Sequence, residues 1–544
     1  MHLFKKGSPG VDSGLIPTKV SLADGGIRPD ASLNPPSGNI KSNDDTLQLL
    51  LKASVIGAST GGLVVLFKTS IQTVQRLLYE DLADVLPKPA FYWPIILYPI
   101  IGSTLVVGLR ALRGDRLNND VNSIARKLRL DTDIEEMDAD AVRGGVQDTL
   151  FRTLAAVATL GSGCSLGPEG PAVEIGTRVS AAISGVTGGN GKYGSSRQDM
   201  RDLFLAGAAA GVGAGFNAPI AGIFFAIECG SKYLTEGKDI DVSSRRDIQD
   251  TRGGGAMKWL GPTSRNTSIK QGTDIAAMVI AATVADLVVG LGLHESQALS
   301  VQGNLFAMKS PIFELPLYIG LGLVAGVVAV SFETFRNESK ALYSQGGALG
   351  TVPKNVRPIL AGVLCGITAL FLPQTLFVGY ATLDDILAGK IHPGLPLSAA
   401  MLAGKMVLSA FALESGLIGG VFAPSLFFGA VLGNLYHDVN LLILQSVQAA
   451  LPAAFASGET ESVLSSFAAG IASLKLANAP AYATVGAASV LSAIFKAPLT
   501  SCILMLELTE NHDIVVPLLV AAATSTQASF LLRQYQQSSN NRGK

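Results

Sequence analysis

The segment Gly161-Ser-Gly-Cys-Ser-Leu-Gly-Pro-Glu-Gly-Pro171 places four glycines and two prolines around one carboxylate, Glu169. Glycine lets the backbone approach a ligand closely, and proline is tolerated in the first turn of a helix. An apolar run follows from Ala172, so the sequence predicts a helix that begins within this segment. The N-terminus of a helix carries free N–H groups and partial positive charge, which favour a bound anion. A carboxylate at that position is predicted to compete with an anion for the same place.

The composition of the chain is that of a membrane protein. Only 15% of its 544 residues are charged, whereas soluble proteins carry about 25%. Hydrophobic residues make up 48%, the mean hydropathy is +0.39, and the 60 glycines are typical of closely packed membrane helices. The net charge of −1 offers no basic field for a nucleic acid. We therefore expect a lipid bilayer, and not a nucleic acid, as the partner.

The cysteines and histidines do not indicate a metal site. No two of the four cysteines have the C-x-x-C spacing, and the five histidines occur singly along the chain. The sequence thus predicts no metal ligands, no cofactor and no disulfide framework.

Hydrophobic segments follow one another from about residue 50 to 532, and many are shorter than the about 20 residues of a full membrane span. Short apolar segments interrupted by glycine or proline indicate broken or re-entrant helices that line a cavity. The sequence therefore predicts an all-α polytopic membrane protein with the organisation of a transporter.

Changes in composition divide the chain into four parts. Residues 1–47 are predicted to form a flexible polar tail, whose five aspartates argue against a clean plastid transit peptide. A first membrane repeat is predicted over 48–300, with a polar loop at 234–272, and a second over 301–535. Residues 536–544 are predicted to form a short tail, so we expect no C-terminal regulatory domains of the CBS type.

One spacing recurs in the two halves around the opening motif. Seven residues separate Ser162-Gly163 from Pro171, and seven residues separate Ser415-Gly416 from Pro424. The second copy, Gly419-Gly-Val-Phe-Ala-Pro424, is again a glycine-proline helix start, but it lacks a carboxylate.

A second spacing recurs downstream, in the same order. Asn217-Ala-Pro219 is followed nine residues after the proline by Glu228, and Lys496-Ala-Pro498 is followed at the same distance by Glu507. We interpret the halves as products of a duplication. Transporters commonly use inverted repeats with the site between the halves, so we expect helix starts from both halves to face one anion. Glu228 and Glu507 are equally compatible with helix-end carboxylates and with a transport role.

These residues resemble the CLC family of chloride channels and anion/proton exchangers. Gly167-Pro-Glu-Gly-Pro171 is similar to the family's G-x-E-G-P motif, and Gly420-Val-Phe-Ala-Pro424 to its G-x-F-x-P motif. Phe216-Asn-Ala-Pro219 and Ala497-Pro-Leu-Thr500 also fit. The similarity runs from about residue 50 to 535 and is strongest to a plant and algal branch placed in plastid or Golgi membranes. The resemblance implies the CLC fold and a homodimer with one pore per subunit.

By this resemblance, Glu169 is the gating glutamate, whose side chain occupies an anion site until it is protonated. The anion-binding residues that it implies are Gly167, Pro168, Gly170, Val421, Phe422 and Tyr535. The spacing of Tyr535 from Pro517 is about three residues shorter than that of the family's pore tyrosine.

Two departures from the family pattern affect the choice of anion and the transfer of protons. The G-S-G-I-P motif with the internal anion-coordinating serine is missing around Leu117–Ser123, which leaves chloride and nitrate both open as substrates. Cys229 stands where exchangers usually carry an internal proton-accepting glutamate.

The resemblance therefore implies transmembrane transport of chloride or a similar small anion such as nitrate, gated by Glu169 and coupled to proton antiport. Burial favours the protonated form of such a carboxylate and helix N–H groups favour the ionised form, so both states are accessible to it. The alternative is a passive voltage-gated anion channel, which Cys229 favours. An organellar membrane, of the chloroplast thylakoid, the chloroplast envelope or the Golgi, is expected.

A rival interpretation from another class is an intramembrane serine hydrolase. Gly163-Cys-Ser-Leu-Gly167 fits the G-x-S-x-G nucleophile elbow, with Ser165 as the nucleophile. That motif requires a preceding strand in an α/β domain, whereas Thr153–Leu160 is rich in alanine and leucine and helical in character. We therefore expect a transport protein and not an enzyme.

Overall fold

The computed structural model describes residues 43–81, 93–113, 139–186, 197–230, 273–293, 311–455 and 475–542. Within these ranges the chain is almost entirely helical, and the extended structure is limited to one isolated pair of residues. The predicted all-α class is confirmed. The predicted loop 234–272, the boundary near residue 300 and almost all of the predicted N-terminal tail lie outside the described residues.

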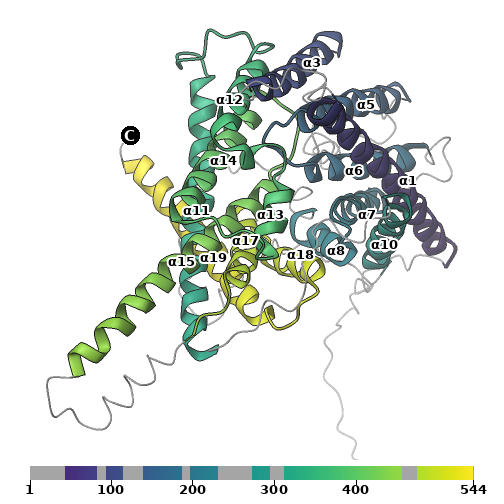
Figure 1. Ribbon diagram of the computed structural model, residues 1–544. Helices are drawn as coiled ribbons and strands as arrows, with labels where there is room; N and C mark the ends of the chain where they lie inside the picture. Colours follow the sequence, from purple (N-terminus) through teal and green to yellow (C-terminus); the bar gives the residue numbers. More distant parts are fainter. Residues whose placement is uncertain are drawn as a thin grey trace, which may run out of the picture. The chain divides into compact units, whose positions relative to one another are not determined.

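The helices of the first half alternate in length (Figure 1). They are α1 (Asn43–Arg76), α3 (Leu97–Arg113), α5 (Ala139–Gly161), α6 (Glu169–Val186), α7 (Arg197–Phe216), α8 (Pro219–Phe225) and α10 (Thr273–Leu293), with π-helical turns at Leu77–Asp81 and Ala226–Gly230 and a 3₁₀ turn at Trp93–Ile96.

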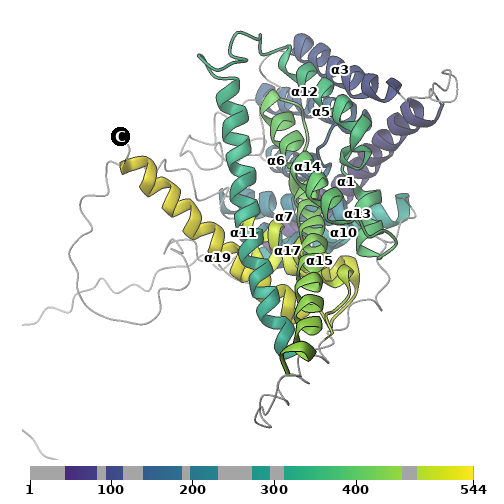
Figure 2. The ribbon, with the colours of Figure 1, turned by 60° about the vertical axis from the view of Figure 1, so that its left-hand side comes forward.

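The second half also combines long and short helices (Figure 2). Its helices are α11 (Pro311–Leu342), α12 (Arg357–Phe371), α13 (Tyr380–Leu387), α14 (Leu395–Ser415), α15 (Phe422–Phe455), α17 (Ala479–Phe495), α18 (Pro498–Thr509) and α19 (Val515–Arg542), with a 3₁₀ turn at Pro373–Thr375. Because α19 continues to Arg542, the segment predicted as a C-terminal tail is helical over most of its length.

Seven of the described helical segments are long and apolar enough to cross a membrane by length and composition: Asp44–Asp81, Pro94–Arg113, Asp274–Leu293, Phe313–Leu342, Leu395–Ser415, Phe422–Ala450 and Val515–Ser539. Other apolar helices of the described residues are too short for a full span: Pro219–Gly230, Arg357–Phe371, Ala479–Phe495 and Pro498–Thr509. This mixture matches the broken helices that the sequence predicts around an internal site.

The duplication is visible in the backbone. Gly163 and its counterpart Gly416 both have left-handed conformations, with φ of 99° and 97°. Asn217 and its counterpart Lys496 share the same rare conformation, with φ of 58° and 56°. A non-glycine residue seldom adopts a positive φ, so its recurrence at matched positions supports a common origin of the two halves.

Helix packing repeats as well. α6 packs on α7 and α15 packs on α17, and in both pairs the contact is made by glycines. A Cβ on Gly176 would collide with the carbonyl group of Gly207, and a Cβ on Gly429 with that of Gly486. Small residues at these crossings let the helix backbones touch, as in other membrane helix pairs.

The short helices α8 and α18 fix the relative orientation of the halves. Glu507 at the end of α18 accepts hydrogen bonds from Ile220 N (2.9 Å) and Ala221 N (2.6 Å) at the start of α8. Glu228, just after α8, accepts them from Leu499 N (3.2 Å) and Thr500 N (2.7 Å) at the start of α18.

Each helix therefore caps the N-terminus of the other, and the two run antiparallel side by side. A twofold axis that relates antiparallel neighbours is perpendicular to both helices, so for membrane helices it lies in the membrane plane. The predicted inverted repeats are confirmed.

Candidate functional site

The two glycine-proline helix starts meet inside the protein. Gly167 and Gly420, which occupy matching positions in the two repeats, form an antiparallel bridge. Gly167 N donates to Gly420 O at 2.8 Å, and Gly420 N donates to Gly167 O at 2.7 Å. Since α6 begins at Glu169 and α15 at Phe422, this bridge holds two helix N-termini side by side.

Glycine is required for this approach. A Cβ on Gly420 would lie 2.7 Å from Gly170 N, and a Cβ on Gly170 would lie 2.8 Å from Gly420 Cα. A Cβ on Gly167 would lie 2.5 Å from Glu169 Oε2. Any larger side chain here would push the helix starts apart, so the glycines of both motifs serve the geometry of one site.

The carboxylate of Glu169 lies at the start of the helix from the other repeat. The residue is 1% exposed, and the Tyr380 hydroxyl donates a hydrogen bond to its Oε1. Oε2 has no partner within hydrogen-bonding geometry among the described residues, but the backbone N–H of Ala423, in the first turn of α15, stabilises the charge. Lys68 on α1 adds a longer-range attraction. A carboxyl group from the first repeat thus lies at the positive end of a helix of the second.

Tyr380 reaches Glu169 because the segment before α13 is held tightly. Gly379 N-caps α13 with φ of 88°, which turns the chain so that Tyr380 begins the helix. The buried Lys405 of α14 supports this turn by donating to Thr375 O at 3.1 Å and Phe377 O at 3.0 Å. These two bonds hold the segment that presents Tyr380 to Glu169.

The loop between α5 and α6 is anchored from other elements. The Tyr79 hydroxyl donates to Ser162 O at 2.9 Å, and Phe377 N donates to Gly163 O at 3.1 Å. Ser409 of α14 donates to Ser165 O at 2.8 Å. These bonds fix the chain that leads into Glu169, so the position of the carboxylate is set by the fold and not by a flexible loop.

The same contacts argue against the hydrolase interpretation. Ser165 is fully buried, and its hydroxyl lies 3.2 Å from that of Ser409. No histidine of the described ranges forms a hydrogen bond with it, and no strand precedes it. Both requirements of a nucleophile elbow are missing at this serine.

Phe422 places an aromatic ring at the meeting point of the repeats. Its ring centroid lies 5.0 Å from that of Phe216 and 4.7 Å from that of Phe495, which are matched residues at the ends of α7 and α17. Phe225 completes the cluster at 5.9 Å. The apolar rings surround the start of α15. They keep the local dielectric constant low, which strengthens electrostatic interactions at the start of this helix.

The predicted anion-binding residues separate into two groups. The structure brings together Gly167, Pro168, Gly170, Val421 and Phe422 around Glu169. Tyr535 lies apart from them, on the C-terminal portion of α19, with 74% of its surface exposed. The tyrosine that contacts the carboxylate is Tyr380, which the sequence motifs did not single out. No motif marks it because its role depends on a contact between segments distant in sequence.

Glu228 and Cys229 take part in structural contacts. Besides the two backbone bonds, Glu228 accepts a hydrogen bond from the Thr500 hydroxyl at 2.6 Å. The thiol of Cys229 donates weakly to Phe495 O at 3.9 Å. The helix-end interpretation of Glu228 and Glu507 therefore has direct geometric support.

A family model described as "Voltage gated chloride channel" matches residues 134–238 and 254–529. The protein "Chloride channel protein CLC-e" of Arabidopsis thaliana is 29% identical over 491 residues, which are 88% of this chain and 59% of that protein. "Chloride channel protein CLC-f" of the same plant is 28% identical over 91% of this chain and 55% of its own length. The chain thus spans somewhat over half the length of these two plant relatives.

Bacterial proteins are similar over more of their own length. "H(+)/Cl(-) exchange transporter ClcA" of Salmonella arizonae is 24% identical over 90% of this chain and 86% of its own. Among solved structures, a "slow cyanobacterial Cl-/H+ antiporter" superposes with a TM-score of 0.64 at 19% identity, covering 89% of this chain and 95% of that one. This likeness shows the fold.

The seven span-length helices and these relatives identify an integral multi-pass membrane protein. Because the family model matches well over half of its residues, the chain belongs to the voltage-gated chloride channel family, whose members are channels and transporters and not enzymes.

Proposed function

We propose that this protein transports chloride or a similar small inorganic anion across a membrane, with Glu169 as the gate and with protons moving in the opposite direction. The observation that supports this most strongly is the position of the Glu169 carboxylate, buried at the first turn of α15 beside Ala423 N–H. That is the place where a helix N-terminus would hold an anion.

The mechanism follows from competition for this place. Ionised Glu169 and an anion repel each other strongly in a poorly solvated site, so only one of them occupies it at a time. Protonation removes the charge of the carboxylate and lets the side chain leave. The backbone N–H groups of α15 and the Tyr380 hydroxyl then become available to the anion. A proton must bind before the anion can enter, and that proton must be released before the ionised carboxylate can return. When the proton is released to the side from which the anion came, the two ions exchange.

The relatives support exchange by their names, which describe a H(+)/Cl(-) exchange transporter in Salmonella arizonae and a Cl-/H+ antiporter in a cyanobacterium. A homodimer and an organellar membrane, in the chloroplast or the Golgi, belong to the same proposal. Light scattering of the purified protein tests the dimer. Imaging of a fluorescent fusion with markers for both organelles tests the location.

A passive anion channel is the second candidate, and one observation favours it. Glu228 is committed to capping α18, and its neighbour Cys229 has no carboxylate with which to relay protons. In this case Glu169 would still gate anion flow, but no net proton transport would accompany it.

Reconstitution into liposomes separates the two. With equal anion concentrations on both sides, a pH gradient shifts the reversal potential of an exchanger away from zero and leaves that of a channel at zero. Repeating the measurement with chloride replaced by nitrate identifies the preferred anion. A purified protein that moves neither anion would overturn the proposal.

A further inference from the structure

A second group of polar side chains lies away from the anion site, where the turn between α13 and α14 meets α15. His392 comes from the turn, and His437 and Asp438 come from α15. His392 Nε2 lies 2.9 Å from Asp438 Oδ1, and His437 Nδ1 lies 3.2 Å from the same oxygen. One candidate ligand atom from each residue falls within 4.8 Å of the other two.

Two imidazole nitrogens and one carboxylate oxygen form a ligand set that suits zinc. Zinc binds such atoms at about 2.0–2.2 Å in a tetrahedral arrangement, which separates neighbouring ligand atoms by about 3.3 Å. The two separations that involve Asp438, 2.9 and 3.2 Å, are close to that value, and the histidine nitrogens lie within 4.8 Å of each other. An ion would replace the hydrogen bonds between the histidines and Asp438 with little movement of the backbone.

The burial of Asp438 gives a second, independent reason for a cation. Its side chain is 11% exposed, and among the described residues its ion-pair partners are the two histidines alone. Burying a carboxylate away from water costs free energy unless opposite charge or hydrogen bonds offset the loss. A divalent cation held by all three side chains would supply that charge.

Neighbouring residues hold the three side chains in place. The amide of Asn434, one turn before Asp438 on α15, donates to Pro393 O at 3.2 Å and so ties the turn that carries His392 to the helix. The His437 ring packs on Tyr482 of α17, with centroids 5.4 Å apart. The site is therefore fixed by three elements before any ion arrives.

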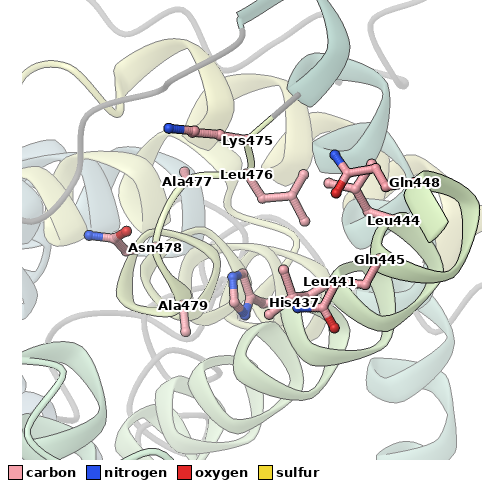
Figure 3. Close-up of a pocket in the computed structure, with 10 residues that line it drawn as sticks. All are labelled: His437, Leu441, Leu444, Gln445, Gln448, Lys475, Leu476, Ala477, Asn478 and Ala479. Atoms are coloured by element: carbon pink, nitrogen blue, oxygen red, sulfur yellow. The ribbon is translucent and has the colours of Figure 1, made fainter. Parts of the chain in front are cut away.

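The site is open to water. The side chain of His392 is 53% exposed, and His437 lines a cavity of about 370 Å³ between α15 and the residues that lead into α17. Figure 3 shows His437 beside Leu441 and Ala479 in the wall of this cavity. Water that reaches His392 from the surface or His437 from this cavity would complete the coordination shell of an ion.

We propose that His392, His437 and Asp438 form a binding site for one zinc ion per subunit, with water as the fourth ligand. The site is separate from the anion site, since His437 lies about 22 Å along α15 from Phe422 at 1.5 Å per residue. The zinc site connects the turn after α13 to α15. The first residue of α13 is Tyr380, and α15 begins at the anion site.

The test is calorimetric titration of the purified full-length protein in detergent, after removal of any histidine tag, with zinc chloride. We expect one zinc ion per subunit and no saturable binding of magnesium or calcium, which prefer oxygen ligands. His392→Gln and Asp438→Asn should each weaken zinc binding by at least about 10- to 100-fold. The exposed His512, outside this group, supplies the matched control, and His512→Gln should bind zinc as the wild type does.

Thermal unfolding provides a second measurement. Zinc should raise the melting temperature of the wild type and of His512→Gln, because a ligand bound only by the folded state stabilises it. It should not raise that of His392→Gln, whose metal-free melting temperature shows whether the variant is folded. Absence of saturable zinc binding to the wild type, or equal binding to folded His392→Gln, would overturn the proposal and would leave the proposed anion transport untouched.

Discussion

At the scale of single residues, the position of one carboxylate organises the site. Glu169 is buried, accepts a hydrogen bond from Tyr380 and lies beside the N–H of Ala423 from the opposite repeat. An ionised side chain in such a position is held by its neighbours, so changes to those neighbours should alter how readily it leaves.

Tyr380→Phe should open the gate more readily. The substitution keeps the ring and removes the hydroxyl that donates to Glu169 Oε1. A hydrogen bond to a charged group contributes about 1.5–3 kcal/mol, so anion flux at neutral pH should rise by about 10- to 150-fold. Flux should also persist to higher pH than in the wild type. Initial rates of anion efflux from liposomes between pH 5 and 8 measure this.

Tyr343→Phe is the matched control for this experiment. Tyr343 is buried, and its hydroxyl has no hydrogen-bond partner among the described residues, so its removal should leave flux unchanged. If Tyr380→Phe and Tyr343→Phe gave the same dependence of flux on pH as the wild type, Tyr380 would have no part in holding the gate.

Sequence motifs predicted the helix starts of this site better than the tyrosine that contacts Glu169. Glu169, Gly167, Gly170 and Phe422 lie in short patterns whose glycines and prolines have a local physical meaning. Tyr380 has none, since its contact with Glu169 depends on how α13 is supported by α14. Tyr535 was assigned by its spacing along the chain. Because α19 continues without a break, it carries Tyr535 to an exposed position.

At the scale of elements, the reciprocal caps of α8 and α18 are the clearest product of the duplication. The first N–H groups of a helix need acceptors, and a carboxylate there also interacts favourably with the helix dipole. Here each short helix supplies the acceptor for the other, through Glu228 and Glu507. This explains why a glutamate stands nine residues after the proline in both repeats.

Glu228→Gln and Glu507→Gln should destabilise the protein by similar amounts, about 1–2 kcal/mol each, because each removes the charge from one helix cap. Neither should change the dependence of anion flux on pH, since both carboxylates are occupied by backbone donors. Denaturation in mixed detergent measures the stability, and the liposome assay measures flux. A variant at Glu228 that abolished proton movement while keeping wild-type stability would contradict the structural role.

The bridge between the two helix starts leads to a further expectation. Gly420→Ala would place a Cβ 2.7 Å from Gly170 N, and the resulting overpacking should reduce stability by about 1–3 kcal/mol and lower anion flux. Gly62→Ala is the control, because nothing lies within 4 Å of a Cβ at Gly62 on α1. Stability of Gly420→Ala equal to that of Gly62→Ala would show that the two helix starts do not touch.

At the scale of the whole molecule, the inverted arrangement gives both repeats access to one place. Two helices that begin at matched positions in antiparallel halves meet at their N-termini, and the positive ends of both dipoles then face the same volume. The repeat was predictable from two matched spacings, and the all-α class from composition and segment length. The antiparallel orientation was not derivable from them, because a recurring spacing is the same whichever way the second copy faces.

The group of His392, His437 and Asp438 was not predicted from the sequence, for the same reason. His392 lies in the turn between α13 and α14, and the other two residues lie on α15. Histidines that occur singly in the sequence carry no ligand spacing, and only the packing of the turn against α15 brings His392 to Asp438. Long-range contacts of this kind are a property of the folded molecule and not of any local pattern.

The most direct measurement is the flux of anions and protons through Glu169→Ala in liposomes under a pH gradient, with the exposed Glu338→Ala as control. We expect Glu169→Ala to conduct anions at every pH, to carry no protons, and to have a reversal potential that no longer responds to the pH gradient. Glu338→Ala should behave as the wild type. Proton-coupled anion transport through Glu169→Ala at the wild-type rate would show that Glu169 is not the gate.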